Sequence, residues 1–152
     1  MRRWLLQRRG FALVIFDLDR FMPLNAEVGH GKGDGALKQV GLEVRGALPR
    51  KGRLYRIGGD EFAVLLPGMT EQQAYNWAET VRKAVEAEVK IVDRHLDSRS
   101  LTVRAAVTEH IPTRRSWSKK DLTPLIMATN GAIVEARLRG GNCVVTRATT
   151  AV

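Results

Sequence analysis

Two short β-type runs in this sequence are separated by only four residues, which combine glycine with carboxylate. The runs cover residues 53–57 and 62–66, and Gly58-Gly59-Asp60-Glu61 joins them. Short apolar runs joined in this way are typical of a β-hairpin, because glycine readily adopts the positive φ angles of tight turns. We therefore expect a hairpin with Asp60 and Glu61 at its tip and Gly58 and Gly59 in the turn. An acidic tip can also be a solvated turn without a function.

A second pair of carboxylates follows the most apolar run of the chain. Residues 11–16 are continuously apolar, which predicts a central strand buried on both faces. Asp17 and Asp19 come at its carboxyl end, where carboxylates face a crevice in many α/β folds. The alternative for both is to cap a helix or form a turn.

The next segment, from Phe21 to Gly35, is rich in glycine and polar residues. It predicts a loop whose backbone can closely approach a ligand. The glycine spacing matches neither the P-loop nor the dinucleotide-binding fingerprint. Asp34 could instead cap the helix that follows.

Apolar periodicity predicts three helices, over residues 37–48, 71–85 and 122–136. Trp77 belongs to the apolar stripe of the second helix, so we expect it in the core. Further strands are predicted at 89–93, 101–108 and 143–145, with a polar loop containing residues 97–99 and a basic loop at 111–120. The order predicts a split βαβ arrangement with an antiparallel hairpin in the sheet.

The 152 residues predict one domain over 11–147, preceded by a basic segment at 1–10 and followed by a tail at 148–152. The net charge of +9 would attract polyanions, although a solvated basic surface explains it equally well. The basic clusters lack the interleaved aromatic residues that stack on bases, so nucleic acid is not the expected partner. A single cysteine fits a reducing cytoplasm. No apolar run approaches the roughly 20 residues that span a bilayer, and the basic start lacks the apolar region of a signal peptide.

Several motifs in order resemble the GGDEF-domain family, the diguanylate cyclases. They are Phe16-Asp17-Leu18-Asp19-Arg20-Phe21, Asn25, Gly29-His30, Gly33-Asp34 and Arg56-Ile57-Gly58-Gly59-Asp60-Glu61-Phe62. The resemblance covers residues 11–146. It implies an α/β (α+β) fold that is palm-like and ferredoxin-related, as in nucleotide cyclases, with a central mixed antiparallel sheet flanked by helices. It also implies the condensation of two GTP molecules into cyclic di-GMP and pyrophosphate.

The resemblance assigns the carboxylates to a metal site. Asp17, the carbonyl of Leu18 and Asp60 would hold Mg²⁺ or Mn²⁺, which suits oxygen ligands. Such metals neutralise charge and orient the attacking and leaving oxygens in phosphoryl transfer. Asp60 and Glu61 are therefore the expected catalytic residues, with Glu61 supporting the site or the deprotonation of the attacking 3′-hydroxyl.

The resemblance also assigns substrate-binding positions. Asn25 and Asp34 match the residues that read the guanine edge. A carboxylate can accept from guanine N1–H and from the exocyclic amine, a donor pair that adenine lacks, so Asp34 favours GTP over ATP. Phe21 is expected to shape the loop. Met22 and Arg137 fall at positions where the family has a lysine that contacts phosphate.

The sequence departs from the family pattern at further positions. Gly141 stands where the family has a phosphate-binding arginine, and Arg104-Ala105-Ala106 replaces the usual Ser-x-Gly of a strand. Each lost charge-assisted contact is worth roughly 1.5–3 kcal/mol, so weaker GTP binding is expected. The product-inhibition motif Arg-x-x-Asp falls on Pro49 and Gly52, so we expect no feedback there.

Two functions therefore remain open. The first is an active diguanylate cyclase that works as a homodimer, stable or transient, because two GTP-loaded sites must meet. The second is a degenerate GGDEF module that binds GTP or another nucleotide and signals through a protein partner without turnover. A nucleic-acid-associated module, suggested by charge alone, ranks third.

Overall fold

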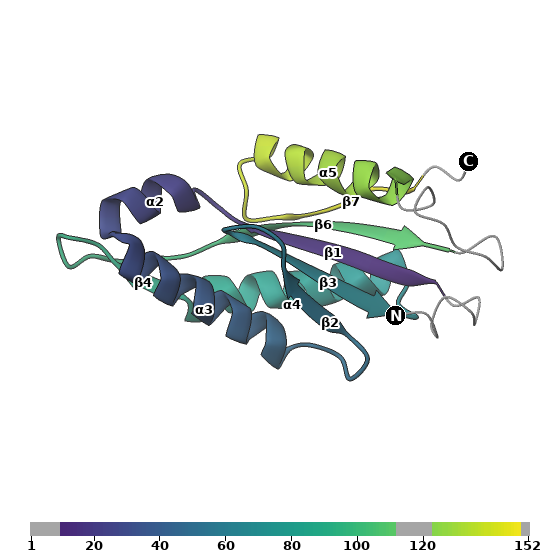
Figure 1. The fold of residues 1–152 in the computed structure, drawn as a ribbon, viewed down its shortest axis with the longest axis horizontal. Coiled ribbons are helices and arrows are strands. Elements are labelled where there is room, and N and C mark those ends of the chain that lie inside the picture. Colours follow the sequence, from purple (N-terminus) through teal and green to yellow (C-terminus); the bar gives the residue numbers. More distant parts are fainter. Residues whose placement is uncertain (1–9, 112–122, 150–152) are drawn as a thin grey trace.

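The core of the protein is a five-stranded sheet with helices on both faces (Figure 1). The structure is a computed structural model that describes residues 10–111 and 123–149. The strand order is β2-β3-β1-β6-β7, and only the β6–β7 pair among these neighbours is parallel. The strands are β1 (Phe11–Leu18), β2 (Arg53–Arg56), β3 (Glu61–Pro67), β6 (Val103–His110) and β7 (Val144–Thr146). This confirms the predicted mixed antiparallel sheet and the hairpin within it.

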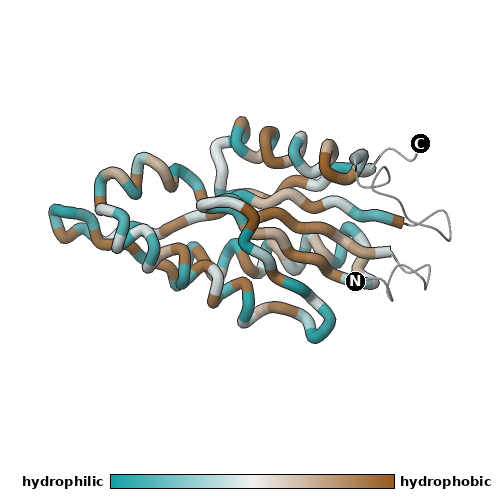
Figure 2. The backbone as a smooth tube through the Cα atoms, in the orientation of Figure 1, coloured by the Kyte–Doolittle hydropathy of each residue, from teal (hydrophilic) through white to brown (hydrophobic). Residues whose placement is uncertain are grey.

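The helices form two layers around this sheet. They are α2 (Phe21–Val28), α3 (His30–Gly46), α4 (Glu71–Glu88) and α5 (Thr123–Leu138). α3 and α4 cover one face and α5 covers the other (Figure 1). In β1, Val14 and Phe16 pack toward α3 and α4, whereas Ile15 packs with residues of α5. Because both faces are covered, β1 is apolar on both faces from residue 11 to residue 16 (Figure 2).

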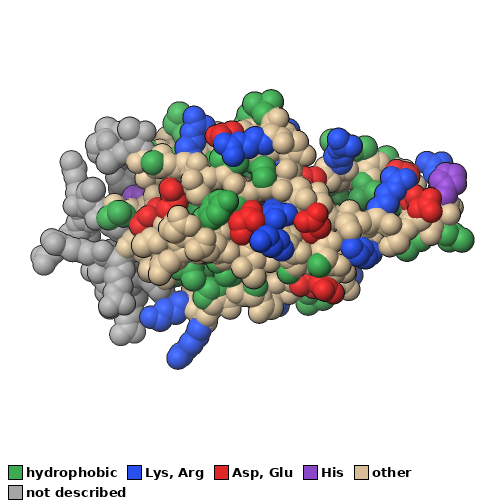
Figure 3. Space-filling view, turned by 180° about the vertical axis from the view of Figure 1, so that it is seen from behind, with side chains coloured by type: hydrophobic (Ala, Val, Ile, Leu, Met, Phe, Trp, Pro, Cys, Tyr) green, Lys and Arg blue, Asp and Glu red, His purple; other side chains and the backbone are tan. Residues whose placement is uncertain are grey.

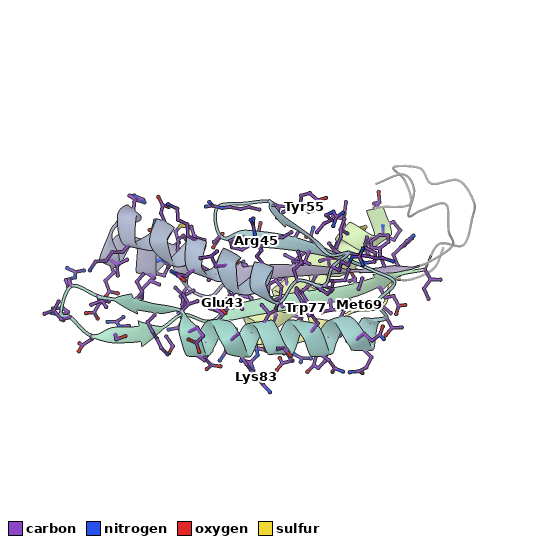
Figure 4. The ribbon with its side chains drawn as sticks, turned by 90° about the horizontal axis from the view of Figure 1, so that it is seen from below. Glu43, Arg45, Tyr55, Met69, Trp77 and Lys83 are labelled. Carbon is purple, nitrogen blue, oxygen red and sulfur yellow. The ribbon has the colours of Figure 1, made fainter. Side chains whose placement is uncertain are left out.

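Trp77 lies between α3 and α4, as Figure 4 shows. Its indole Nε1 donates to the carbonyl oxygen of Ala47 at 2.7 Å, and its ring meets Phe16 edge-on with a centroid distance of 5.8 Å. A partly buried indole that packs against the core with its N–H paired is a core residue rather than a platform for ligands. The sequence prediction for Trp77 is therefore confirmed.

The predicted glycine-rich loop is wrong, because α2 and α3 occupy this segment and break only at Gly29, whose φ is 89°. The five glycines of α3 weaken it as a helix, but α3 gains more from burying an apolar stripe at helical spacing. Its buried residues are Gly33, Ala36, Leu37, Val40 and Val44. Asp34 lies inside α3 and does not cap it.

The predicted polar loop around residues 97–99 is also partly wrong. β5 (Ser98–Ser100) pairs antiparallel with β4 (Lys90–Val92) in a separate two-stranded sheet. The buried carboxylate of Asp93 organises the turn between them by accepting from the amides of His95 and Asp97 at 2.8 and 3.0 Å. A side chain that bonds the backbone a few residues on is a local turn signal that strand periodicity does not reveal.

The surface carries both signs of charge. On the face shown in Figure 3, acidic and basic side chains are interspersed rather than separated. The basic clusters of the sequence, at 2–9 and 114–120, lie outside the described residues, as does most of the predicted basic loop. Among the described helices, none has the length and apolar character needed to cross a bilayer.

Candidate functional site

The β2–β3 hairpin forms as predicted, but its turn is held differently. The guanidinium of Arg56 donates to the carbonyl oxygens of Gly58 and Gly59 at 3.3 and 2.6 Å. Neither glycine adopts a positive φ, so the reason given for them in the sequence analysis is wrong. Gly58 is needed for a close approach instead, because a Cβ there would lie 2.8 Å from Oε2 of Glu61.

Strand register brings the hairpin tip to the end of β1. β1 extends to Leu18, so Asp17 lies inside the strand, opposite Glu61 of β3. The amide of Leu18 donates to the carbonyl oxygen of Asp60 at 3.2 Å, which fixes the tip against β1. The structure thus brings Asp17, Asp60 and Glu61 together, as the sequence predicted.

An arginine lies beside this carboxylate group. Arg104 of β6 is the other cross-strand neighbour of Asp17, on the face covered by α5. Its guanidinium pairs through Nη2 with Oδ2 of Asp17 and through Nη1 with Oδ1 of Asp19 at 3.0 Å. Asp17 is 2% exposed and Arg104 is 8% exposed. Arg137 of α5 approaches the same oxygen of Asp17 at 3.5 Å from a side chain that is 64% exposed.

Burial raises the pKa of Asp17. Arg104 lowers it through charge and hydrogen bonding, while the negative charges of Asp60 and Glu61 raise it further. Asp60 and Glu61 are therefore close enough to act on the charge of Asp17. A site with this charge distribution favours a cation, and Arg104 supplies one.

Asp19 links the end of β1 to β6 and to the turn that precedes β7. Its carboxylate accepts from Oγ1 of Thr102 at 2.8 Å and from the backbone amide of Asn142 at 2.7 Å, in addition to the bond from Arg104. A carboxylate with this many donors is fixed in place. Asp19 thus has a structural role, although it caps no helix: the N-cap of α2 is Arg20, which has no side-chain cap bond.

The position of Asp19 explains why residue 141 is glycine. Gly141 has a φ of 78°, and a Cβ at this position would lie 2.3 Å from Oδ1 of Asp19. The neighbouring Arg139 points elsewhere and pairs with Glu135 on the surface of α5. The departure noted at Gly141 is therefore built into the packing around Asp19.

The predicted guanine-reading residues lie where α2 meets α3. Nδ2 of Asn25 is 2.8 Å from Nδ1 of His30, and Oδ1 of Asn25 is buried without a hydrogen-bond partner. Gly33 permits this packing, since a Cβ there would lie 1.9 Å from that oxygen. Asp34 follows directly and is exposed.

Two other predicted substrate-binding residues are the first two residues of α2. Phe21 is partly buried and packs against the core, which fits a role in shaping this segment. Met22 is 80% exposed and offers no charge to a phosphate.

The arrangement of Asp17, Asp60 and Glu61 does not fit a divalent cation. Carboxylate and carbonyl oxygens are suitable ligands in type. However, Oδ2 of Asp17 is within reach of two guanidinium groups. Within the described residues, no three His, Cys, Asp or Glu side chains are positioned to hold one metal ion. The charge that a metal would supply at Asp17 already comes from Arg104.

From the sequence, Arg104 is only a departure from the Ser-x-Gly pattern of a family strand, and Asp19 has no predicted partner. One signal was available. An arginine in the apolar first half of a strand must find an anion when it is buried, because an unpaired buried charge is costly. Only the register of β1 against β6 identifies that anion.

Comparison with known proteins gives a consistent result. A family model described as the diguanylate cyclase GGDEF domain matches residues 2–143. The diguanylate cyclase TpbB of Pseudomonas aeruginosa is 35% identical over 108 residues, which are 70% of this chain and 25% of that protein. The uncharacterized protein YhcK of Bacillus subtilis is 39% identical over 93 residues, 61% of this chain and 26% of that protein. The chain thus matches about a quarter of the length of these relatives.

Solved structures share the fold. The GGDEF domain of TpbB (YfiN) from Pseudomonas aeruginosa superposes with a TM-score of 0.79 at 24% identity, covering 95% of this chain and 89% of that one. The diguanylate cyclase SiaD from the same organism, solved in complex with its activator SiaC, gives a TM-score of 0.76 at 27% identity, with coverage of 95% and 57%.

Proposed function

Because this chain belongs to the GGDEF family of diguanylate cyclase domains, we propose that it is a guanine-nucleotide-binding module that signals through a protein partner without two-metal turnover. The observation that carries the proposal is the pairing of Arg104 with Asp17. In this family fold, divalent metals would activate the attacking hydroxyl and neutralise the triphosphate. In this chain, Arg104 instead neutralises Asp17, the carboxylate at which such a metal would bind.

Asn25 and Asp34, where α2 meets α3, support the recognition of a guanine base. The unpartnered, buried Oδ1 of Asn25 is an acceptor whose bonding capacity is unused. Asp34 is exposed one residue beyond the glycine on which Asn25 packs, and its carboxylate can accept from both donors of the guanine edge. The pair discriminates by leaving a buried acceptor unsatisfied when the wrong base is bound.

Arg137 supports recognition of the phosphates. Its guanidinium is largely exposed, lies near Asp17 and carries a permanent positive charge. Arginine binds phosphate in a fork geometry, and a phosphate would compete with Asp17 for this group. A partner protein would then sense whether the nucleotide is bound. A protein partner is known for one relative, the diguanylate cyclase SiaD, which was solved in complex with its activator SiaC.

An active diguanylate cyclase is the second candidate. The grouping of Asp60 and Glu61 with Asp17 at the hairpin tip favours it, because the register of β1 and β3 places the three carboxylates side by side. Turnover would require Arg104 to leave Asp17 and two copies of the domain to meet.

One experiment compares nucleotide binding with product formation. Calorimetry with GTP and with ATP, each in chelator and in excess Mg²⁺, should give GTP binding that does not need the metal. Asp34→Asn replaces an acceptor by a donor at the guanine edge and should weaken GTP binding by about 1.5–3 kcal/mol. Glu88→Gln, an exposed carboxylate on α4, is the matched control and should change nothing.

Product formation is measured by mass spectrometry after incubation with GTP and Mg²⁺ or Mn²⁺ at high protein concentration. The proposal expects no cyclic dinucleotide. A cyclic dinucleotide that disappears in Asp60→Ala would instead establish the cyclase, and absence of GTP binding under all conditions would reject both functions.

A further inference from the structure

The central feature of the site is a row of three charged residues across neighbouring strands. Glu61 of β3, Asp17 of β1 and Arg104 of β6 are register partners, so their side chains stand on the same face of the sheet. The middle position of the row is a buried carboxylate. Its charge must be compensated by a cation at close range.

Arg104 meets this need from a fixed position. Its two terminal nitrogens bond Asp17 and Asp19, which gives the planar guanidinium two anchors. Asp19 is itself held by Thr102 and by the amide of Asn142. An arginine cannot lose its proton under these conditions, so the compensation is permanent.

A divalent cation at Asp17 would compete with this guanidinium for the same oxygen. To bind there it would have to displace Nη2 of Arg104 from Oδ2 of Asp17 and leave a buried arginine with one partner fewer. Nε of Arg104 is already buried without a hydrogen-bond partner, so further loss would make the side chain less favourable still. Both the like charges and the lost hydrogen bond oppose the metal.

We propose that Arg104 is a built-in cation that takes the place of a divalent metal at Asp17 and excludes that metal from the site. The inference deepens the proposed function and rests on it only for the claim that the excluded metal belongs to a nucleotide site. It concerns a residue of this chain and can be tested without any enzymatic activity.

The test is a Mn²⁺ titration of the full chain after chelator treatment, followed by electron paramagnetic resonance of the unbound ion. The wild-type chain should show no saturable Mn²⁺ site that depends on Asp17. Arg104→Ser should gain one, with an affinity for Mn²⁺ at least roughly tenfold higher than that of any binding by the wild type. This is the size of change seen when groups around a metal ligand are altered. Adding Asp17→Asn to Arg104→Ser should remove the gained site.

A matched control separates this effect from a general loss of positive charge. Arg45 is exposed near the end of α3, where Figure 4 labels it, and Arg45→Ser removes the same charge away from the row. It should leave Mn²⁺ binding as in the wild type. A gain of similar size in Arg45→Ser would overturn the inference, because the metal would then respond to net charge alone.

Arg104→Ser leaves two carboxylates without their arginine and can lower stability, so a second measurement is included. The melting temperature of Arg104→Ser should rise with Mn²⁺ or Mg²⁺, whereas that of the wild type should not. If Arg104→Ser does not fold, Arg104→Lys keeps one charge but cannot bridge both carboxylates, and it should show an intermediate gain.

The result that overturns the inference is wild-type binding of Mn²⁺ that is lost in Asp17→Asn, or equal affinities in wild type and Arg104→Ser. This outcome is distinct from failure of the proposed function. GTP binding is measured separately in chelator, and its absence would reject nucleotide recognition while leaving the metal titration valid.

Discussion

Substitution of Gly141 tests whether the packing around Asp19 determines the composition of this site. Gly140 and Gly141 follow α5, both have positive φ angles, of 97° and 78°, and both donate backbone amides to carbonyls of α5 at 3.0 Å. They differ in their surroundings. Around a Cβ at residue 140 nothing lies within 4 Å, whereas a Cβ at residue 141 would lie 2.3 Å from Oδ1 of Asp19.

The expected magnitudes follow from this difference. Gly140→Ala carries only the cost of a left-handed residue with a side chain, about 1–2 kcal/mol. Gly141→Ala carries a similar backbone cost and must also move Asp19, and inserting a methyl group into a filled position typically adds about 1–3 kcal/mol. We therefore expect Gly141→Ala to lower the free energy of unfolding by more than Gly140→Ala does. Gly141→Arg, which restores the residue type of the family, should be at least as destabilising.

The assay is urea unfolding followed by far-ultraviolet circular dichroism on the wild type and both alanine variants. The same pair of substitutions is then made in Asp19→Ala. Because that change removes the carboxylate, the excess cost of Gly141→Ala over Gly140→Ala should disappear. Equal costs in the wild-type background, or an excess that persists without Asp19, would refute the reasoning.

Three other outcomes are expected. Gly33→Ala should displace Asn25, whose Oδ1 would lie 1.9 Å from the new Cβ, and should weaken GTP binding, whereas Gly35→Ala, with open space around its Cβ, should leave calorimetric GTP binding unchanged. Burial by itself would raise the pKa of Asp93, but the amides of its own turn and a nearby arginine lower the pKa overall. Its stabilising effect should therefore be complete above the ordinary aspartate pKa of about 3.9 and be lost as the pH falls below it, so Asp93→Asn should flatten the acid side of a stability profile. Thr70→Ala removes the capping box of α4 and should cost about 1 kcal/mol in urea unfolding; no measurable cost would contradict the role given to the cap.

Much of the fold could be predicted because its signals are local. The continuous apolar run of β1, the hairpin around residues 58–61 and the apolar stripe of α4 each determine an element within a short window. The segment 29–35 was misjudged for the same reason. Its glycines favour a loop locally, whereas the burial of Val40 and Val44 against the sheet, a tertiary effect, makes it the first turns of α3.

The carboxylates of the candidate site could be predicted from the sequence, but the side chains that pair with them could not. Asp17, Asp60 and Glu61 could be grouped because a strand end and a hairpin tip are sequence features. The contact of Asp17 with Arg104 joins residues separated by most of the chain, and it depends on the register of two strands. A shift of one residue would have turned Arg104 to the opposite face, so no local pattern could reveal the pair.

The departures of this chain from the family pattern depend on one another. Arg104 is stable in the sheet because both Asp17 and Asp19 bond it, and Asp19 in that position fills the space beside Gly141. An arginine at residue 141, as in the family, would crowd Asp19 while Asp19 bonds Arg104. The chain thus has an additional cation, Arg104, beside Asp17. It lacks a cation at residue 141, which is expected to contact the triphosphate. An incoming triphosphate would meet Arg137, which is exposed and only 3.5 Å from Asp17, and it could draw that side chain away. The buried Arg104 would remain, so Asp17 stays neutralised whether or not a nucleotide is bound.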